Sequence, residues 1–187
     1  MRVRHFPVRT PIVLAAVMAL GACANMNSGM APYSQASLPD AVKVPAGHVV
    51  AMETVGAGDL TYECRVKTGM AGQFEWVFVG PDAKLMNRKG LQIGRYYGPP
   101  ATWENMDGSK VSGAQVAVAP AASMSDIPVQ LVKANPAMGS GAMQGVSYIQ
   151  RVATKGGVAP SMACGAATLG QKQVVKYQAD YIFWRAS

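Results

Sequence analysis

Short stretches in which apolar and polar residues alternate, separated by glycine and proline, constrain the fold of this chain most. Residues 60–67 are the clearest case, because Leu60, Tyr62 and Cys64 fall on one face of an extended strand and polar side chains fall on the other. No stretch combines the 3.6-residue period of an amphipathic helix with capping residues. The pattern therefore predicts an all-β domain.

Turn signals divide the chain into strands. We predict hairpins at residues 56–59 and 88–90, strand ends at 80–82 and 98–100, and a turn at 107–108. Pro128 favours an edge strand, because proline has no N–H for the ladder. The sequence predicts a single sandwich or barrel-like domain of about eight to ten mostly antiparallel strands. The predicted strands are 48–55, 60–67, 74–79, 85–87, 91–97, 111–118, 127–133, 145–154 and 174–184.

The first 22 residues have the composition of an export signal. Three arginines precede an uncharged apolar run at residues 11–20, which is too short to span a bilayer core that needs about 20 residues. Leu20-Gly21-Ala22-Cys23 follows the pattern of a bacterial lipoprotein cleavage site, with Cys23 as the lipidated first residue. Ala22-Cys23-Ala24 also fits an ordinary signal-peptidase site, which would release a soluble periplasmic or secreted protein.

We predict a protein anchored by lipid in the cell envelope, and in the outer membrane where there are two membranes, since no aspartate follows Cys23. Residues 1–22 are then the signal, 23–45 the lipidated cysteine and a flexible tether, and 46–187 the β domain. Loss of the signal leaves 165 residues and lowers the formal charge from +7 to +4. The remaining basic residues are scattered, so we expect no nucleic-acid partner.

Two cysteines remain once Cys23 is assigned to lipid. Export places Cys64 and Cys164 in an oxidising compartment, where a disulfide is the default. A redox-active or metal-binding thiol pair is the alternative, but the two cysteines lack a C-x-x-C spacing. His48 is the single histidine after the signal, and the methionines are dispersed rather than grouped as copper ligands. We therefore predict no metal site and no cofactor.

The segment 96–109 has the densest set of side chains suited to a ligand. Its candidate binding residues are Tyr96, Tyr97, Trp103, Glu104 and Asp107. Aromatic rings stack on sugars while carboxylates bind hydroxyls, so envelope glycan is the first ligand to consider. Glu104 and Asp107 could also form the acid/base pair of a hydrolase. A structural interpretation competes with both: Trp103 packs in the core, Glu104 pairs with Arg95, and residues 107–109 form a turn.

Arg151 is the sixth candidate, because it shares a strand face with the apolar Ile149 and Ala153. An arginine among apolar neighbours needs an anion or hydrogen-bond acceptors. Glu104 and Asp107 are the partners we expect first, in a structural tie. An anion-binding role is the alternative. The Gly156-Gly157 pair that follows lacks the strand–helix context of a phosphate-binding loop.

Several motifs of this chain occur together, in the same order, in one known family. The matching residues are Tyr62-Glu63-Cys64; Trp76, Gly80, Pro81, Ala83 and Leu85; Trp103, Glu104, Asp107, Gly108, Ser109, Val111 and Gly113; the Ile-Gln-Arg-Val run and its continuation at 149–164; and Tyr177, Ala179, Tyr181 and Phe183. Over residues 46–184 the chain resembles the bacterial and fungal secreted family known as domain of unknown function 3455. The resemblance implies a secreted β domain and carries no activity with it.

This chain departs from that family's pattern at two places. Tyr96-Tyr97 stands where members carry His-Tyr, and Ile127-Pro128-Val129 stands where members carry Ile-Pro-Trp. Any chemistry that depends on that histidine is therefore absent here. We predict a non-catalytic binding or structural module of the cell envelope, with a carboxylate-dependent hydrolase as the alternative.

Overall fold

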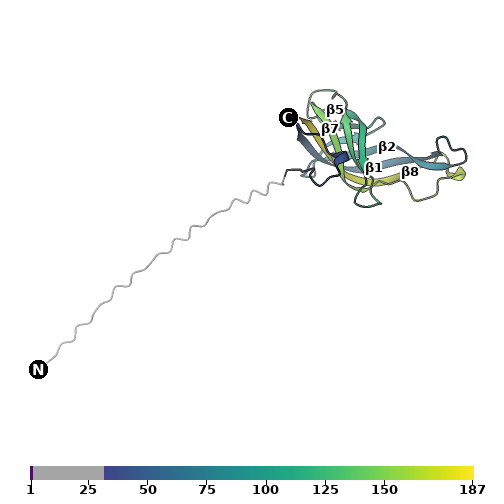
Figure 1. The fold of residues 1–187 in the computed structure, drawn as a ribbon, viewed down its shortest axis with the longest axis horizontal. Helices are drawn as coiled ribbons and strands as arrows, with labels where there is room; N and C mark the ends of the chain where they lie inside the picture. Colours follow the sequence, from purple (N-terminus) through teal and green to yellow (C-terminus); the bar gives the residue numbers. More distant parts are fainter. Residues whose placement is uncertain (2–31) are drawn as a thin grey trace. The chain divides into compact units, whose positions relative to one another are not determined.

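In the computed structural model, which describes Met1 and residues 32–187, eight antiparallel strands form one closed barrel in their order along the chain (Figure 1). The prediction of an all-β, barrel-like domain with one disulfide is confirmed. The predicted signal and Cys23 lie outside the described residues. The strands are β1 (His48–Val66), β2 (Phe74–Met86), β3 (Gln92–Tyr97), β4 (Thr102–Asn105), β5 (Lys110–Ala119), β6 (Val129–Ala134), β7 (Val146–Gly156) and β8 (Lys172–Ala186).

The hairpin predicted at residues 56–59 is wrong, because β1 runs through these residues without a turn. Gly56 and Gly58 serve close packing instead. A Cβ atom on Gly56 would overlap the ring of Tyr181, and one on Gly58 would overlap the backbone of Asp82 and Ala83. Glycine inside a strand often marks such an approach, which the sequence pattern alone does not separate from a turn.

Three further strand predictions need correction. β2 continues through residues 80–82, which pair with β1, and the register shift between the two strands falls just before them, at Val79. Pro128 does not mark an edge strand: it immediately precedes β6, which pairs with β5 on one side and β7 on the other. The short β4 was not predicted. The hairpin at 88–90 and the turn at 107–108 are confirmed, with Gly90 and Gly108 at positive φ.

Alternation along the strands places one set of apolar side chains inside the barrel and another on its wall. On β8, Tyr177, Tyr181 and Phe183 pack inside, whereas Ile182 and Trp184 point outward. The outward pair is nevertheless buried. The barrel therefore has a second apolar layer on part of its outer wall.

Residues 33–44, here called the N-terminal strap, cover that outer layer. Val42 and Val44 are buried against it, and the 3₁₀ helix η1 (Asp40–Val42) lies within the strap. Gln150 of β7 is fully buried; it donates to the carbonyl of Val42 at 2.7 Å and accepts from the indole N–H of Trp184 at 2.9 Å. This part of the predicted flexible tether is thus ordered, because a few apolar side chains spaced among polar ones dock on the wall.

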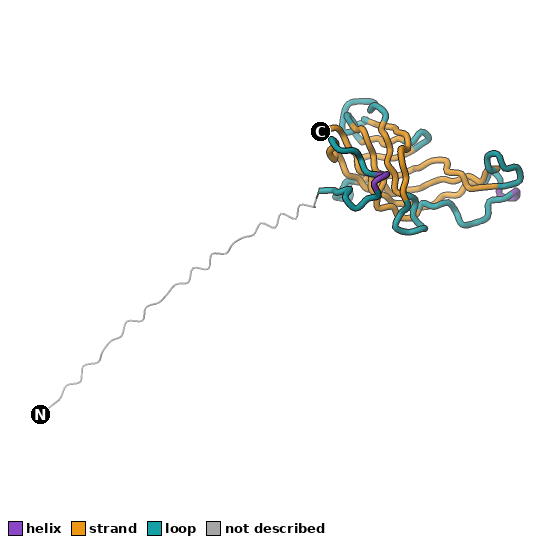
Figure 2. Tube along the Cα trace, in the orientation of Figure 1, coloured by secondary structure: helices purple, strands orange, loops and turns teal. Residues whose placement is uncertain are grey.

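Beyond the barrel, β1, β2 and β8 continue as a three-stranded extension, here called the arm (Figure 1). In the arm, β2 before Asp82 and β8 before Tyr177 pair with β1 alone. The loop that precedes β8 runs beside these strands to the tip of the arm and contains the 3₁₀ helix η2 (Ala166–Thr168) (Figure 2). The Cys64–Cys164 disulfide joins this loop to β1, with a Cα–Cα distance of 5.5 Å. No helix among the described residues is long and apolar enough to span a membrane.

Candidate functional site

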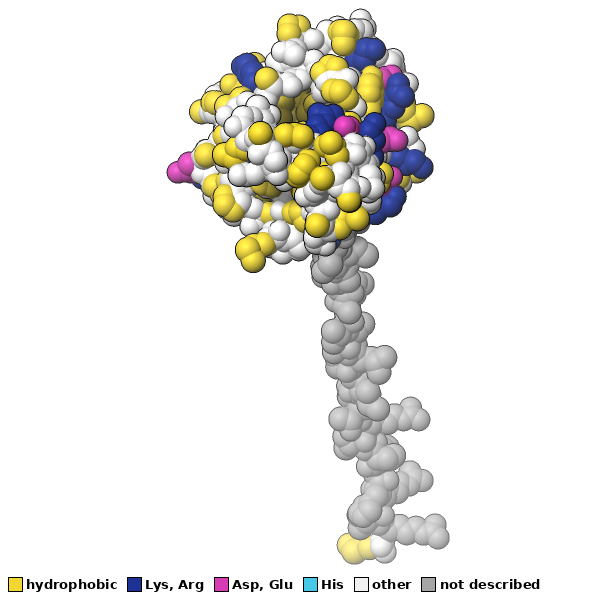
Figure 3. Space-filling model, turned by 90° about the vertical axis from the view of Figure 1, so that its right-hand side faces the viewer, with side chains coloured by type: hydrophobic (Ala, Val, Ile, Leu, Met, Phe, Trp, Pro, Cys, Tyr) yellow, Lys and Arg dark blue, Asp and Glu magenta, His cyan; other side chains and the backbone are white. Residues whose placement is uncertain are grey.

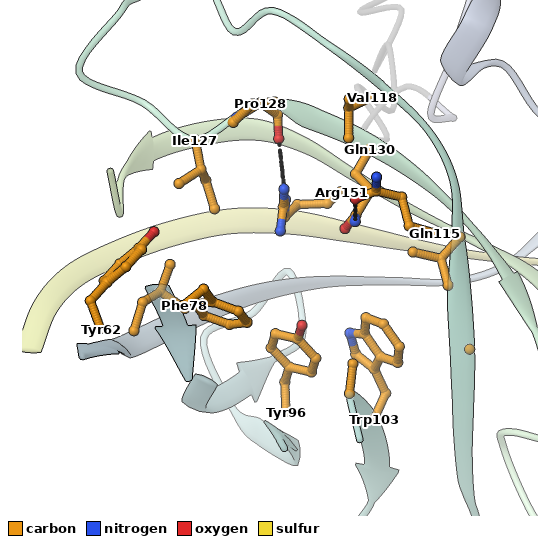
Figure 4. A pocket seen from close by; sticks show the side chains of 14 residues that line it. Tyr62, Phe78, Tyr96, Trp103, Gln115, Val118, Ile127, Pro128, Gln130 and Arg151 are labelled. Atoms are coloured by element: carbon orange, nitrogen blue, oxygen red, sulfur yellow. Dashed lines mark hydrogen bonds between the residues drawn. The ribbon is translucent and has the colours of Figure 1, made fainter. Parts of the chain in front are cut away.

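A cavity of about 410 Å³ opens at the end of the barrel from which the arm extends. The space-filling view shows a hollow bordered by hydrophobic side chains, with the blue of a basic side chain at its edge (Figure 3). Every strand of the barrel except β8 contributes at least one side chain or flanking residue to the lining. The lining residues are Leu60, Tyr62, Phe78, Tyr96, Ala101, Trp103, Gly113, Gln115, Val118, Ile127, Pro128, Gln130, Val132 and Arg151 (Figure 4).

Arg151 provides the charge of this cavity. Its Nε and Nη2 donate to the carbonyl oxygen of Pro128, at 3.3 and 2.9 Å. Within residues 32–187, it forms no ion pair with any carboxylate. The partners expected from the sequence, Glu104 and Asp107, are therefore wrong, because one carbonyl from the chain entering the neighbouring strand takes their place. Arg151 lines the cavity, and of the two residues expected on its strand face Ile149 is buried and Ala153, at a bulge in β7, is exposed.

The loop before β6 holds the acceptor of Arg151 in place. The carboxylate of Asp126 accepts from the backbone N–H of Gly156 at 2.6 Å, and the N–H of Ile127 donates to the carbonyl of Gly156 at 2.9 Å. These bonds fasten the loop to the end of β7, the strand that carries Arg151. The Pro128 carbonyl is consequently fixed beside the guanidinium group.

Aromatic side chains form the wall opposite Arg151. Tyr96 and Trp103 stack with their ring centroids 4.6 Å apart, and Tyr181 packs against both. The hydroxyl of Tyr96 points toward Arg151 (Figure 4). The indole N–H of Trp103 is buried and has no hydrogen-bond partner in the described part of the chain. Trp103 is 1% exposed, so its ring packs in the core rather than on the surface.

At the mouth of the cavity the aromatic lining reaches solvent. Phe78 is 48% exposed and packs edge-on against Tyr62. The hydroxyl of Tyr62 donates to the carbonyl of Gly157 at 2.7 Å, which orients its ring. Across the mouth, Gln130 donates to Gln115 at 2.6 Å. The entrance is therefore apolar on one side and lined by amides on the other.

Burial raises the pKa of the tyrosines around the cavity. Desolvation is the main cause for Tyr62, Tyr96, Tyr177 and Tyr181, and the positive charge of Arg151 opposes it at each one. All four hydroxyls are consequently neutral at physiological pH.

Glu104 and Tyr97 lie on the other face of the sheet from Tyr96 and Trp103. Glu104 accepts hydrogen bonds from the hydroxyl of Tyr97 at 2.7 Å and from Arg95 at 3.0 Å, and Arg95 lies over the Tyr97 ring. The hydrogen bonds from Tyr97 and Arg95 lower the pKa of Glu104. The predicted pairing of Glu104 with Arg95 is confirmed, and it forms a cluster on the outside of the barrel.

Asp107 lies at the opposite, closed end of the barrel. Its carboxylate accepts from the hydroxyl and N–H of Ser109, at 2.6 and 2.8 Å, and from the N–H of Ala142 at 2.8 Å. The Ser109 hydroxyl also accepts from the N–H of Met143, whose side chain is fully buried. These bonds, Ser109 first, lower the pKa of Asp107. Asp107 fastens the loop that closes this end of the barrel.

The geometry gives the hydrolase alternative no support. A glycosidase needs one carboxyl group whose raised pKa lets it act as an acid. Both Glu104 and Asp107 have a lowered pKa, because each carboxylate accepts several hydrogen bonds. Neither lines the cavity. Among residues 32–187, no three His, Cys, Asp or Glu side chains gather as a metal site would require.

The six candidates thus separate into three groups. Tyr96, Trp103 and Arg151 line the cavity; Tyr97 and Glu104 form the outer cluster; Asp107 closes the far end. The sequence prediction missed the cavity's other polar and aromatic residues, which are Tyr62, Phe78, Gln115 and Gln130. Inward alternation on β1 indicated Tyr62, but bulges in β2 and β5 concealed which way Phe78 and Gln115 point.

Residues 45–185 match the family described as "Protein of unknown function (DUF3455)", and the chain belongs to this family. The resemblance noted from the motifs is therefore confirmed. No curated protein and no solved structure matched the chain.

Proposed function

We propose that this member of the family is a non-catalytic envelope protein that binds a small molecule inside the open end of its barrel. One observation carries the proposal: a solvent-open cavity of about 410 Å³ with aromatic walls and an arginine that has no carboxylate partner in the described chain. Ligand pockets typically measure about 300–1,000 Å³ and combine apolar walls with a few polar groups. Eight-stranded barrels are also of the size that can hold one small ligand.

A small ligand fits this geometry better than the envelope polysaccharide that the sequence suggested. Polysaccharide recognition needs aromatic faces at the surface, whereas Trp103 and Tyr96 are buried and stacked on each other. The exposed outer cluster offers one tyrosine, Tyr97, whose ring Arg95 already covers. The aromatic side chains of residues 96–109 therefore serve the cavity wall more than the surface.

Binding is tested with 1-aminoanthracene, an uncharged fluorophore that brightens in apolar surroundings. We expect the purified protein to enhance its fluorescence with saturation at one site. Val118→Trp fills the cavity mouth and should abolish the signal, and Ala101→Trp provides a second filling variant. Val116→Trp is the matched control, because Val116 is an exposed valine of the same strand outside the lining. Equal binding by Val116→Trp and both filled variants, or no binding by the unaltered protein, would reject the cavity as the site.

We also propose that Cys23 carries the lipid that holds the domain at the membrane. The lipoprotein cleavage pattern supports this. Mass spectrometry of the N-terminal peptide should find acyl chains on Cys23 and lose them in Cys23→Ser. An unmodified cysteine or a free Ala24 terminus would favour the soluble alternative.

A further inference from the structure

The open cavity offers one fixed cation and no fixed anion. Other arginines of the described chain form ion pairs with carboxylates, as Arg88 does with Glu53 and Asp180. Arg151 instead meets a single carbonyl, which compensates its charge only in part. A charge beside apolar walls is costly without a counter-charge, so the site favours a ligand that supplies one.

The guanidinium group has donors left for that ligand. Arginine has five N–H donors, and the Pro128 carbonyl occupies one on Nε and one on Nη2. Both N–H groups of Nη1 and one of Nη2 remain. One N–H of Nη1 and the free N–H of Nη2 lie along one edge of the planar group, the arrangement that pairs with the two oxygens of a carboxylate.

The rest of the cavity lining favours a ligand with an apolar body. Leu60, Ile127 and Val132 are buried, and they line it together with the rings of Tyr62, Phe78 and Tyr96. The exposed Phe78 and Val118 continue the apolar surface to the mouth. Tyrosine hydroxyls stay neutral and do not repel an anion.

Resting on the proposed function, we propose that the ligand is a monocarboxylate with an apolar alkyl or aryl body, its carboxylate paired with Arg151 and its body packed among the aromatic side chains. The outer arginine, Arg95, shows the contrast. Its charge is already compensated by Glu104 at 3.0 Å, and its side chain is 60% exposed. Arg95 therefore has a counter-charge within the described chain, which Arg151 lacks.

The test displaces 1-aminoanthracene with acids and with the alcohols of the same skeleton: octanoate against 1-octanol, and 4-phenylbutyrate against 4-phenylbutanol. We expect the acid of at least one pair to bind about 10- to 100-fold more tightly than its alcohol, the range for a charge-assisted hydrogen-bonded pair. Comparison of the two pairs distinguishes an alkyl ligand from an aryl one.

Variants then assign the preference to Arg151. Arg151→Gln should remove the acid preference and leave alcohol binding unchanged, and Arg151→Lys, which keeps the charge without the planar edge, should retain part of it. Arg95→Gln removes one positive charge from β3 outside the cavity, and this variant should retain the full acid preference. If Arg151→Gln does not fold, the acid preference of Arg151→Lys provides the test: a reduced preference supports the assignment to Arg151, and an unchanged preference contradicts it.

The outcomes separate this inference from the function on which it rests. Equal binding of acids and alcohols, or an acid preference that survives in Arg151→Gln, overturns the carboxylate assignment and leaves the binding cavity standing. Failure of 1-aminoanthracene and of both ligand pairs to bind overturns both proposals.

Discussion

The two ends of the barrel differ in how their polar groups are satisfied. At the closed end, Asp107 and Ser109 bond to the loop that carries Met143, and Ser109 and Met143 are fully buried. At the open end, Arg151 has one carbonyl partner, and Phe78 is about half exposed. Satisfied buried networks stabilise a fold, whereas unsatisfied groups in an accessible cavity are typical of binding sites. We therefore assign stability to the first end and ligand binding to the second.

Met143→Ala should have the largest effect on stability. Removal of a fully buried methionine leaves a void in the barrel core and should lower the free energy of unfolding by about 2–5 kcal/mol. Met138→Ala in the same loop is the control, since Met138 is 51% exposed and should change stability little. Urea denaturation measures both. A Met143→Ala variant as stable as the control would contradict the assignment of stability to the closed end.

Ser109→Ala should have the next largest effect. Its hydroxyl is buried and bridges Asp107 to the N–H of Met143, so its loss leaves that N–H without a partner. We expect a destabilisation of about 1–3 kcal/mol by urea denaturation, with 1-aminoanthracene affinity unchanged. Ser123→Ala, an exposed serine bonded to Ser125, should be neutral. A loss of binding in Ser109→Ala would connect the closed end to the cavity.

The charge of Asp107 should make a smaller contribution to stability, and this contribution should depend on pH. Its hydrogen bonds lower the pKa in the folded state, so its stabilising contribution is complete above the unfolded pKa and is lost as pH falls through the folded pKa. The difference in melting temperature between the unaltered protein and Asp107→Asn should be constant above about pH 5 and shrink below about pH 4. A constant difference down to pH 3 would show that the charge of Asp107 does not contribute to the stability of the protein.

Arg151→Gln should change stability least. The Pro128 carbonyl lines an open cavity where water can replace the guanidinium, so we expect the free energy of unfolding to change by less than about 1 kcal/mol. Thermal unfolding without ligand measures it. A loss as large as that of Met143→Ala would make Arg151 a structural residue and remove the difference between the two ends.

Much of the fold could be predicted because the strand pattern is local. Tyr62 and Cys64 on β1, and Tyr177, Tyr181 and Phe183 on β8, face inward as their alternation indicates. Gly56 and Gly58 led to the wrong prediction of a hairpin, because glycine occurs both in turns and where strands pack closely. Only the positions of Tyr181 and Ala83 in the folded barrel distinguish the two cases. The strap escaped prediction because its few apolar residues have a place to dock only once Ile182 and Trp184 form the outer layer.

The site was harder to predict because it depends on closure of the barrel. The sequence indicated that Arg151 shares a strand face with the apolar Ile149, and nothing local indicated that the Pro128 carbonyl would be its partner. Tyr96 and Trp103 meet Arg151 only because β3 and β4 lie across the barrel from β7. Glu104 and Asp107 are close to Trp103 along the chain but point elsewhere, and proximity in sequence wrongly grouped them with it.

The most direct test of the binding cavity is an NMR measurement of intermolecular contacts to bound octanoate in the disulfide-intact protein. We predict nuclear Overhauser effects from its methylene protons to the rings of Tyr62, Phe78 and Tyr96, and none to the methyl group of Met143. Contacts confined to surface residues outside the cavity, or contacts to Met143, would contradict the assignment of binding to the open end.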